Sequence, residues 1–398
     1  MVGEVKVREG YKKTEVGIIP EDWMLTKLAQ LTTEIGDGIH TTPSYVAKSE
    51  FYFINGNNLS NGEVVLFDET KCVSYGEYMK HMKKLNNRTT LMSINGTIGN
   101  LAYYNDERII LGKSVCYINI NKVTKKEFVY FQLKSKYVSA FYKDELTGST
   151  IKNLSLKSIR NTPIIIPCNE EEQKAIATAL TDIDNLIQSL KKLIEKKKKI
   201  KQGTMQQLLT GKKRLPGFSG ELIKLQLKDI LELNKGSQLN RNTLSEKGDY
   251  PVINGGIEPS GYTSVWNCSE ETITISEGGN SCGYVNFLRT KFWSGGHLYT
   301  VKLKYDTIYK QYLYYLLKFN EPKIMSLRVG SGLPNIQKKS IGEFQLNFMA
   351  DYEEQQAIAQ VLSDMDSEIE VLEQKLEKLK TIKQGMMQEL LTGRIRLI

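Results

Sequence analysis

The stretch from Glu171 to Leu215, EEQKAIATALTDIDNLIQSLKKLIEKKKKIKQGTMQQLLTGKKRL, returns near the end of the chain as residues 353–397, EEQQAIAQVLSDMDSEIEVLEQKLEKLKTIKQGMMQELLTGRIRL. The two copies lie 182 residues apart and are identical at 26 of 45 positions without a gap. Upstream of each copy the similarity fades to short matches. The chain is therefore a tandem repeat whose two halves share nearly the same ends and differ in their front parts.

Each copy predicts a long helix. Glu171–Leu209 and Glu353–Leu391 contain no proline, and their apolar residues recur at alternating spacings of three and four, which is the seam of a coiled coil. Both stretches end in Leu-Leu-Thr-Gly, so Gly211 and Gly393 suit a left-handed C-cap. The predicted seam consists of Ile176, Leu180, Ile183, Ile187, Leu190 and Ile194 in the first copy, and Ile358, Leu362, Met365, Ile369, Leu372, Leu376 and Leu379 in the second.

The two predicted helices differ in charge. Residues 170–215 hold 11 basic and six acidic side chains, whereas residues 352–398 hold six basic and nine acidic ones. Opposite net charges favour pairing of the two helices within one chain over pairing between copies. The pair should be antiparallel, because parallel helices would bring the globular segments that precede them into collision.

The segments before the helices predict mixed α/β modules, which we name module 1 (residues 1–169) and module 2 (residues 216–351). Both contain short β-rich runs broken by glycine and asparagine turns, followed by one aromatic helical stretch, at residues 126–141 and 306–319. We therefore expect an α+β fold with two pseudo-repeated mixed α/β modules, separated by two long antiparallel helices that form an intramolecular coiled coil. The expected domains are module 1 (residues 1–169), a first long helix (170–215), module 2 (216–351) and a second long helix (352–398).

Composition narrows the class of protein. With 398 residues, 40% of them hydrophobic, the chain can build several cores, and no apolar run is long enough to span a bilayer. The first residues show no secretory signal, and the five cysteines are scattered without a C-x-x-C pair, so we expect a cytoplasmic protein without a disulfide framework or zinc site. The excess of 54 basic over 45 acidic residues is compatible with a nucleic-acid partner.

Catalytic motifs are missing from the sequence. No (N/D)-P-P-(Y/F/W) box of a base methyltransferase occurs, and no H-E-x-x-H occurs. The segment Leu111–Ser114, LGKS, resembles the end of a phosphate-binding loop, but Glu107 stands where that motif requires glycine. The three histidines are far apart in the sequence. We therefore predict no catalytic residues and no metal site in this chain.

The loops of both modules are rich in small polar residues beside glycine. Asparagine, arginine, lysine, histidine, serine and threonine are suited to bind base edges and phosphates, although they are also common in surface loops of any kind. The candidate DNA contacts are His40, Thr41, Asn57, Asn95 and Lys113 in module 1, and Arg241, Asn254, Asn280, Ser281 and His297 in module 2.

Several of these stretches resemble a known family. Residues 11–23, YKKTEVGIIPEDW, resemble the usual opening of the DNA-specificity (S) subunit of type I restriction–modification systems, and so does the doubled helix motif E-E-Q-x-A-I-A…D-x-D…K-Q-G…L-L-T-G. Residues 35–43, IGDGIHTTP, and 251–256, PVINGG, resemble parts of its target-recognition domains. The similarity covers essentially the whole chain.

The resemblance implies a function and partners. Each target-recognition domain would read one half of a bipartite double-stranded DNA target, and the helices would set the half-site spacing and dock two methyltransferase (modification) subunits. Restriction subunits, which are ATP-driven translocases, can join such a complex. S-adenosylmethionine, ATP and magnesium then belong to the partners, and this chain needs no cofactor. The family supplies no catalytic residues.

The predicted helix length fits this expectation. The 34 residues from Ile176 to Leu209 would extend about 50 Å, or about 15 base pairs. Two other interpretations stay open at this point. One is a stand-alone modifying enzyme or nuclease with tandem recognition domains, and the other is a coiled-coil adaptor without a DNA function.

Overall fold

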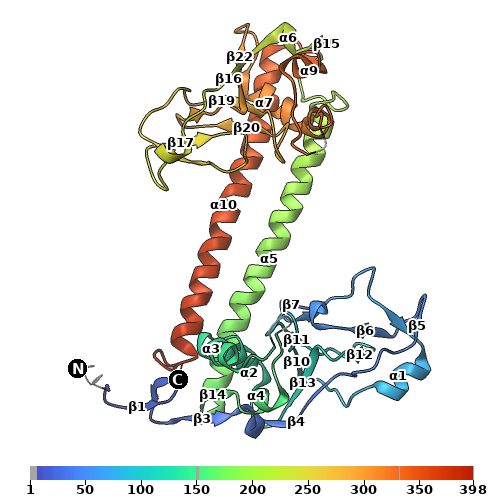
Figure 1. The fold of residues 1–398 in the computed structure, drawn as a ribbon, viewed down its shortest axis with the longest axis vertical. Coiled ribbons are helices and arrows are strands. Elements are labelled where there is room, and N and C mark those ends of the chain that lie inside the picture. The colour runs from blue at the N-terminus through green and yellow to red at the C-terminus, as the bar shows by residue number, and fades with distance from the viewer. Residues whose placement is uncertain (1–6, 149–151, 331, 398) are drawn as a thin grey trace. The chain divides into compact units, whose positions relative to one another are not determined.

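The computed structural model of the chain describes residues 7–148, 152–330 and 332–397. It divides into two compact units, Met1–Leu190 with Lys375–Ile398, and Lys191–Gln374. Each unit contains one module together with parts of two long helices, α5 (Glu170–Leu208) and α10 (Tyr352–Leu390) (Figure 1). The predicted α+β fold is confirmed, and each long helix begins and ends one residue before its predicted position.

Module 1 is built on two four-stranded sheets. The antiparallel sheet has the order β11-β10-β13-β4 and the mixed sheet has the order β12-β6-β9-β5, in which β12 and β6 are parallel. In Figure 1, β5 and β6 lie at the end of module 1 that is farthest from α5. The strands of these sheets are β4 (Thr32–Asp37), β5 (Tyr45–Val46), β6 (Tyr52–Ile54), β9 (Cys72–Val73), β10 (Thr89–Ser93), β11 (Leu101–Tyr103), β12 (Ile109–Leu111) and β13 (Val115–Ile120).

Smaller elements complete module 1. The pair β14–β3 leads directly into α5, and the hairpins β1–β2 and β7–β8 lie at its edges. These elements are β1 (Tyr11–Thr14), β2 (Gly17–Pro20), β3 (Trp23–Lys27), β7 (Leu59–Ser60), β8 (Glu63–Val64), β14 (Pro163–Pro167), α1 (Tyr75–His81), α2 (Lys126–Leu133), α3 (Lys136–Glu145) and α4 (Leu156–Arg160).

Module 2 repeats this topology. Its antiparallel sheet has the order β20-β19-β22-β16, and a three-stranded sheet β18-β17-β21 contains a parallel pair, β17–β21, in the place of β6–β12. The elements are β15 (Leu222–Gln226), β16 (Leu231–Lys235), β17 (Tyr250–Ile253), β18 (Gly261–Thr263), β19 (Thr272–Ser276), β20 (Val285–Leu288), β21 (Trp293–Ser294), β22 (Leu298–Leu303), β23 (Gln345–Met349), α6 (Leu227–Ile230), α7 (Lys310–Phe319), α8 (Glu321–Met325) and α9 (Lys338–Gly342).

The aromatic helical stretches differ from their prediction. Residues 126–141 form two helices, α2 and α3, because Ser135 is extended and its hydroxyl accepts from the amide of Val138 as an N-cap. In module 2 the helix starts at Lys310, later than the predicted residue 306. The aromatic faces are core: Phe128 and Tyr312 are fully buried.

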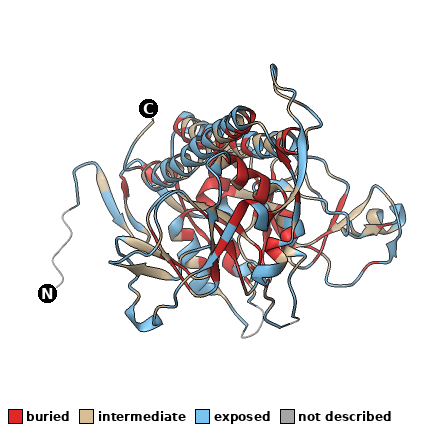
Figure 2. Ribbon diagram, turned by 90° about the horizontal axis from the view of Figure 1, so that it is seen from above, coloured by how far each residue is buried: buried red, intermediate tan, exposed pale blue. Residues whose placement is uncertain are grey.

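The long helices are antiparallel within each unit. In the first unit Asp184 of α5 pairs with Lys383 of α10, and in the second Lys201 pairs with Asp366. Buried and exposed residues alternate along both helices (Figure 2). The six seam residues of α5 are all buried. In α10 Ile358, Leu362 and Ile369 are buried, whereas Met365, Leu372, Leu376 and Leu379 are half-buried.

Each unit closes one main core over the ends of both helices. In the first unit Ile176 and Leu180 of α5, Leu390 of α10 and the adjoining Leu391 pack with the buried residues of module 1. Three residues beyond the end of each helix, the predicted glycines Gly211 and Gly393 are left-handed, with φ angles of +68° and +71°. In the second unit the residues that pack into the main core are Met205 and Leu208 of α5 with the adjoining Leu209, and Ile358 and Leu362 of α10.

Candidate nucleic-acid and partner interfaces

The two sheets of module 1 meet at one region of its surface, which we call the tip of the module. The segment Gly112–Val115 passes from β12 to β13, and the neighbouring loops bond to its backbone. The amide of Gly112 donates to Ile54 O at 2.9 Å, and the amide of Ile94 donates to Ser114 O at 2.9 Å. Because the amide of Gly38 also donates to Val115 O at 3.0 Å, three chain segments are tied to this one short segment.

This tip gathers the predicted DNA contacts of module 1. His40, Thr41, Asn57 and Lys113 are exposed on the tied loops and segment, and Asn95 is half-buried beside them. The Nε2 atom of His40 lies 2.9 Å from Oδ2 of Asp37, which orients the imidazole. The five side chains therefore lie in one surface region, and the prediction that they contact DNA stays a prediction.

Module 2 has the same backbone arrangement at its tip. Here Gly295–Leu298 is the crossing segment, and the amide of Gly295 donates to Ile253 O at 2.8 Å. The amide of Glu277 donates to His297 O at 2.9 Å, as Ile94 does to Ser114 in module 1. The two tips therefore correspond residue by residue, with Glu277 in the place of Ile94 and His297 in the place of Ser114.

The close approach of backbones at each tip requires glycine. A Cβ atom on Gly38 would lie 2.1 Å from Leu111 O, and one on Gly236 would lie 2.3 Å from Ser294 O. No side chain fits at such distances. The tip is therefore a rigid backbone frame that presents variable side chains.

Four of the five predicted residues of module 2 come to its tip. The Oδ1 atom of Asn254 accepts from the amide of His297 at 3.3 Å, and Asn280 and Ser281 lie in the turn that follows Glu277. Arg241 is exposed in a 3-10 turn, Arg241–Thr243, and no hydrogen bond of the described residues connects its side chain to the other four.

The sequence analysis missed Glu277 and Lys235 as residues of this tip. Glu277 is buried, and its Oε1 accepts from Lys235 Nζ at 2.7 Å and from the Tyr299 hydroxyl at 2.9 Å. Burial by itself would raise the pKa of Glu277, but hydrogen bonds from Lys235 and Tyr299 and the nearby charges of Lys235 and His297 lower that pKa overall. The sequence signal that could have identified Glu277 is its position, directly after the strand Thr272–Ser276 and directly before Gly278 and Gly279.

A second candidate interface lies at the junction of modules and helices. In the first unit the guanidinium of Arg396 donates to the buried carboxylate of Glu172 at 2.8 Å and to Asp22 at 2.7 Å. The indole of Trp23 also donates to Glu172, at 3.1 Å. The hydrogen bonds with Glu172 and Asp22 raise the pKa of Arg396 above its ordinary value. The segment that follows α10 is thus fixed to module 1 and to the start of α5.

The second unit repeats this junction. Arg214 Nε donates to the buried Glu354 at 2.6 Å, and Arg214 and Glu354 are the residues 182 positions from Arg396 and Glu172. The side-chain amide of Gln173 donates to Pro167 O at 2.9 Å, and that of Gln355 donates to Met349 O at 2.9 Å. The junctions therefore repeat in side chains as well as in backbone.

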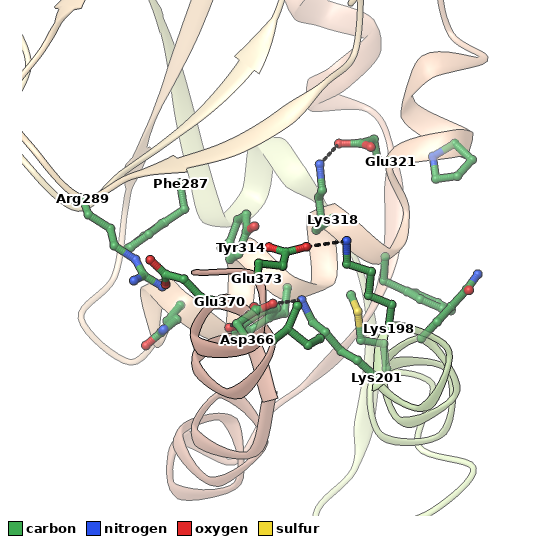
Figure 3. A pocket seen from close by; sticks show the side chains of 17 residues that line it. Lys198, Lys201, Phe287, Arg289, Tyr314, Lys318, Glu321, Asp366, Glu370 and Glu373 are labelled. Atoms are coloured by element: carbon green, nitrogen blue, oxygen red, sulfur yellow. Dashed lines mark hydrogen bonds and ion pairs between the residues drawn. The ribbon is translucent and has the colours of Figure 1, made fainter. Parts of the chain in front are cut away.

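The second unit also contains a groove of about 710 Å³ between α5, α10 and α7. Figure 3 shows ion pairs on its walls: Lys198 with Glu373 at 2.6 Å, Lys201 with Asp366, and Lys318 with Glu321 at 2.6 Å. Glu370 adds a further acidic group. The positions equivalent to Glu370 and Glu373 in the other repeat are Gln188 and Lys191, so the two repeats differ in charge here.

Metal and membrane sites were also sought in the described ranges. Residues 7–148, 152–330 and 332–397 contain no group of three or more histidine, cysteine, aspartate or glutamate side chains that could hold a metal ion. No helix in this part of the chain has the length and apolar character needed to cross a bilayer.

Known proteins resemble this chain over most of its length. A family model described as type I restriction modification DNA specificity domain matches residues 20–202 and again residues 222–381. A Methanocaldococcus jannaschii protein named as a type I restriction enzyme specificity subunit is 28% identical over 427 aligned positions, 98% of this chain and 97% of that protein. A Mycoplasma genitalium protein named as a type I specificity subunit is 22% identical and matches 72% of this chain and 76% of its own length.

Solved structures show the same fold. The crystal structure of a type I restriction–modification S subunit from M. genitalium superposes with a TM-score of 0.70 and 19% identity, covering 98% of this chain and 99% of that one. A chain from a structure of an assembled type I system superposes with a TM-score of 0.56 and 16% identity over 95% of this chain and 99% of that one.

Proposed function

The chain belongs to the type I restriction–modification DNA specificity family, and we propose that it is the non-catalytic subunit that selects the DNA target of a methyltransferase and restriction complex. One observation carries the proposal: the two tips share a glycine-dependent backbone frame but present different side chains. Module 1 has Ile94 and Ser114 where module 2 has Glu277 and His297. A protein that reads two unlike half-sites needs this combination.

The test separates the two tips. The chain would be purified with its methyltransferase partner, and the target would first be defined by mapping methylated bases in the source cell. Substitutions at the module 1 tip, such as Asn57→Ala with Lys113→Ala, should weaken binding to duplexes that carry the first half-site and leave discrimination at the second unchanged. Absence of any sequence-dependent duplex binding, measured across salt concentrations, would instead support the adaptor interpretation.

The helices support a role in half-site spacing. Each has 39 residues, which at 1.5 Å per residue is a length of about 58 Å. Repeating residues 184–190 after Leu190 and residues 370–376 after Leu376 would lengthen both by one heptad, or about 10 Å and about 3 base pairs. We expect the methylated half-sites to move apart by that amount. An unchanged gap would contradict the spacing role.

The repeated junctions support docking of two copies of one partner, which we propose to be methyltransferase subunits. S-adenosylmethionine, ATP and magnesium then belong to the methyltransferase and restriction subunits, and the complex acts on DNA in the cytoplasm. Because Glu370 and Glu373 of this groove stand where the other repeat has Gln188 and Lys191, Glu370→Lys with Glu373→Lys should release one of two methyltransferase subunits. Native mass spectrometry would detect the change, with Gln188→Lys as the matched control.

A further inference from the structure

The carboxylate of Glu277 is an unusual group to find at the tip of module 2. Its side chain is 7% exposed, and Oε1 accepts from Lys235 and Tyr299 as described above. The other oxygen, Oε2, is buried and has no hydrogen-bond partner among the described residues. The Nδ1 atom of His297 lies 3.6 Å from it, just beyond hydrogen-bond distance.

The fold itself does not require this carboxylate. Module 1 has the same backbone frame with Ile94 at the equivalent position, where the side chain is 3% exposed. Burying an acceptor without a full set of hydrogen bonds is unfavourable, and burying a charge is more so. An apolar residue would therefore stabilise module 2 at least as well, so the carboxylate needs a reason other than packing.

The side chains around the Glu277 carboxylate indicate why it is there. Lys235 and His297 both face the Glu277 carboxylate, yet their side chains are 53% and 62% exposed. One buried anion therefore holds two exposed groups a few ångströms apart. The backbone of His297 is also fixed, because its amide donates to Asn254. With Nδ1 of the imidazole turned to Glu277, Nε2 is the ring nitrogen left for an outside contact.

We propose that Glu277 is a positioning residue that holds Lys235 and His297 side by side so that they read the major-groove edge of one purine in the second half-site. This inference rests on the proposed DNA-reading function. Both purines offer N7 as an acceptor and a second polar group at C6, so two neighbouring side chains match one purine edge. Lys235 Nζ donates to N7, and His297 Nε2 faces the group at C6.

A phosphate offers similar acceptor oxygens and is the competing source of contact. A lysine binds phosphate as a point charge and needs no fixed neighbour. A base edge, in contrast, presents two atoms at a set separation, which only positioned side chains can match. The buried carboxylate that fixes both groups therefore favours a base over a phosphate.

The experiment uses the full chain in complex with its methyltransferase partner and replaces each purine of the second half-site in turn by its 7-deaza analogue. This change removes N7 and keeps base pairing. At one position we expect about tenfold weaker binding by the parent complex. In Lys235→Met and in Glu277→Ile, which installs the module 1 residue, the same replacement should change the affinity less than twofold. Lys302→Met, an exposed lysine on β22, is the matched control and should keep the tenfold effect.

The outcomes are distinct. If no position responds in the parent, or if the response survives in both variants, the inference is wrong. In Lys235→Met the slope of log K against log salt could fall by about 0.9 while the 7-deaza effect persists. That result would assign a phosphate contact to Lys235 and overturn the base contact. Binding to the first half-site and the thermal midpoint, recorded in parallel, show whether each variant is folded. If the parent complex prefers no sequence at all, the proposed function fails, and not this inference alone.

Discussion

The junctions and the tips of the two units follow opposite rules. At the junctions the same side chains occur twice: Arg396 donates a hydrogen bond to Glu172 in one unit, and Arg214 donates one to Glu354 in the other. At the tips the same backbone bonds occur twice, but Ile94 in one module corresponds to Glu277 in the other. Identical side chains suit identical partners, whereas a fixed backbone with exchangeable side chains suits two different DNA half-sites.

The difference also shows where stability and specificity lie in this chain. The carboxylates of the junction pairs are buried at the places where the main cores close over both helices, so changes there should affect folding of a whole unit. The tip side chains are mostly exposed, so changes there should affect binding and leave the cores intact. The following substitutions test this division, each with an equivalent in the other unit.

Loss of a junction arginine should have the largest effect. Arg396→Met leaves the buried carboxylate of Glu172 without its cation, and Arg214→Met does the same to Glu354, so each should lower the free energy of unfolding by about 3–5 kcal/mol. Hydrogen exchange should rise in the first unit alone for Arg396→Met and in the second unit alone for Arg214→Met. Urea midpoints like that of the parent would show that the junction pairs are dispensable. Arg394→Met, which removes an exposed arginine, is the control.

A methyl group on a tip glycine should have the next largest effect. Gly38→Ala and Gly236→Ala place a Cβ atom against backbone carbonyl oxygens, which should cost about 1–3 kcal/mol and displace the loops of one tip. Duplex binding should then lose discrimination at one half-site only, the first for Gly38→Ala and the second for Gly236→Ala. The helix variants Gly203→Ala and Gly385→Ala meet no atom within 4 Å and should not weaken binding. Equal loss at both half-sites would mean that the modules are not independent readers.

Local sequence patterns were sufficient to predict the two long helices. The heptad spacing and the repeat of residues 171–215 predicted both helices to within one residue, because helix formation there depends on neighbours three and four positions apart. The helix predicted over residues 126–141 was wrong in one respect, since Ser135 caps a new helix in its middle. Nothing in a periodic pattern shows that break.

The tip of module 2 was predicted only in part, because its key interaction is not local. Asn254 and His297 could be selected as polar residues in glycine-rich loops. Glu277 could not be recognised as a positioning group, since its partners Lys235 and Tyr299 are 42 and 22 residues away in sequence. Only the strand order of the sheet brings the three together.

The central ion pairs of the helices should differ modestly between units. Lys383 is paired with Asp184, and burial lowers the pKa of this lysine, with the charge of Lys134 acting in the same direction. Lys134 can partly replace Lys383 beside Asp184, whereas in the second unit the equivalent Lys318 is engaged by Glu321. We therefore expect Lys201→Met to destabilise the chain by about 1 kcal/mol more than Lys383→Met. Urea unfolding of both variants measures the difference, and the reverse order would contradict this account.

The smallest expected effect concerns a single exposed charge. Lys113 lies on the crossing segment of module 1, where module 2 has Gly296. If Lys113 neutralises one phosphate, Lys113→Gly should reduce the slope of log K against log salt by about 0.9, and Gly296→Lys should increase it by about the same amount. Lys122→Ala, which changes an exposed lysine two residues beyond the end of β13, should leave the slope unchanged. A changed base preference with an unchanged slope would assign Lys113 to a base edge instead. A protein that loses a phosphate contact releases fewer counterions on binding, which reduces the slope, and binds all sequences more weakly by the same factor.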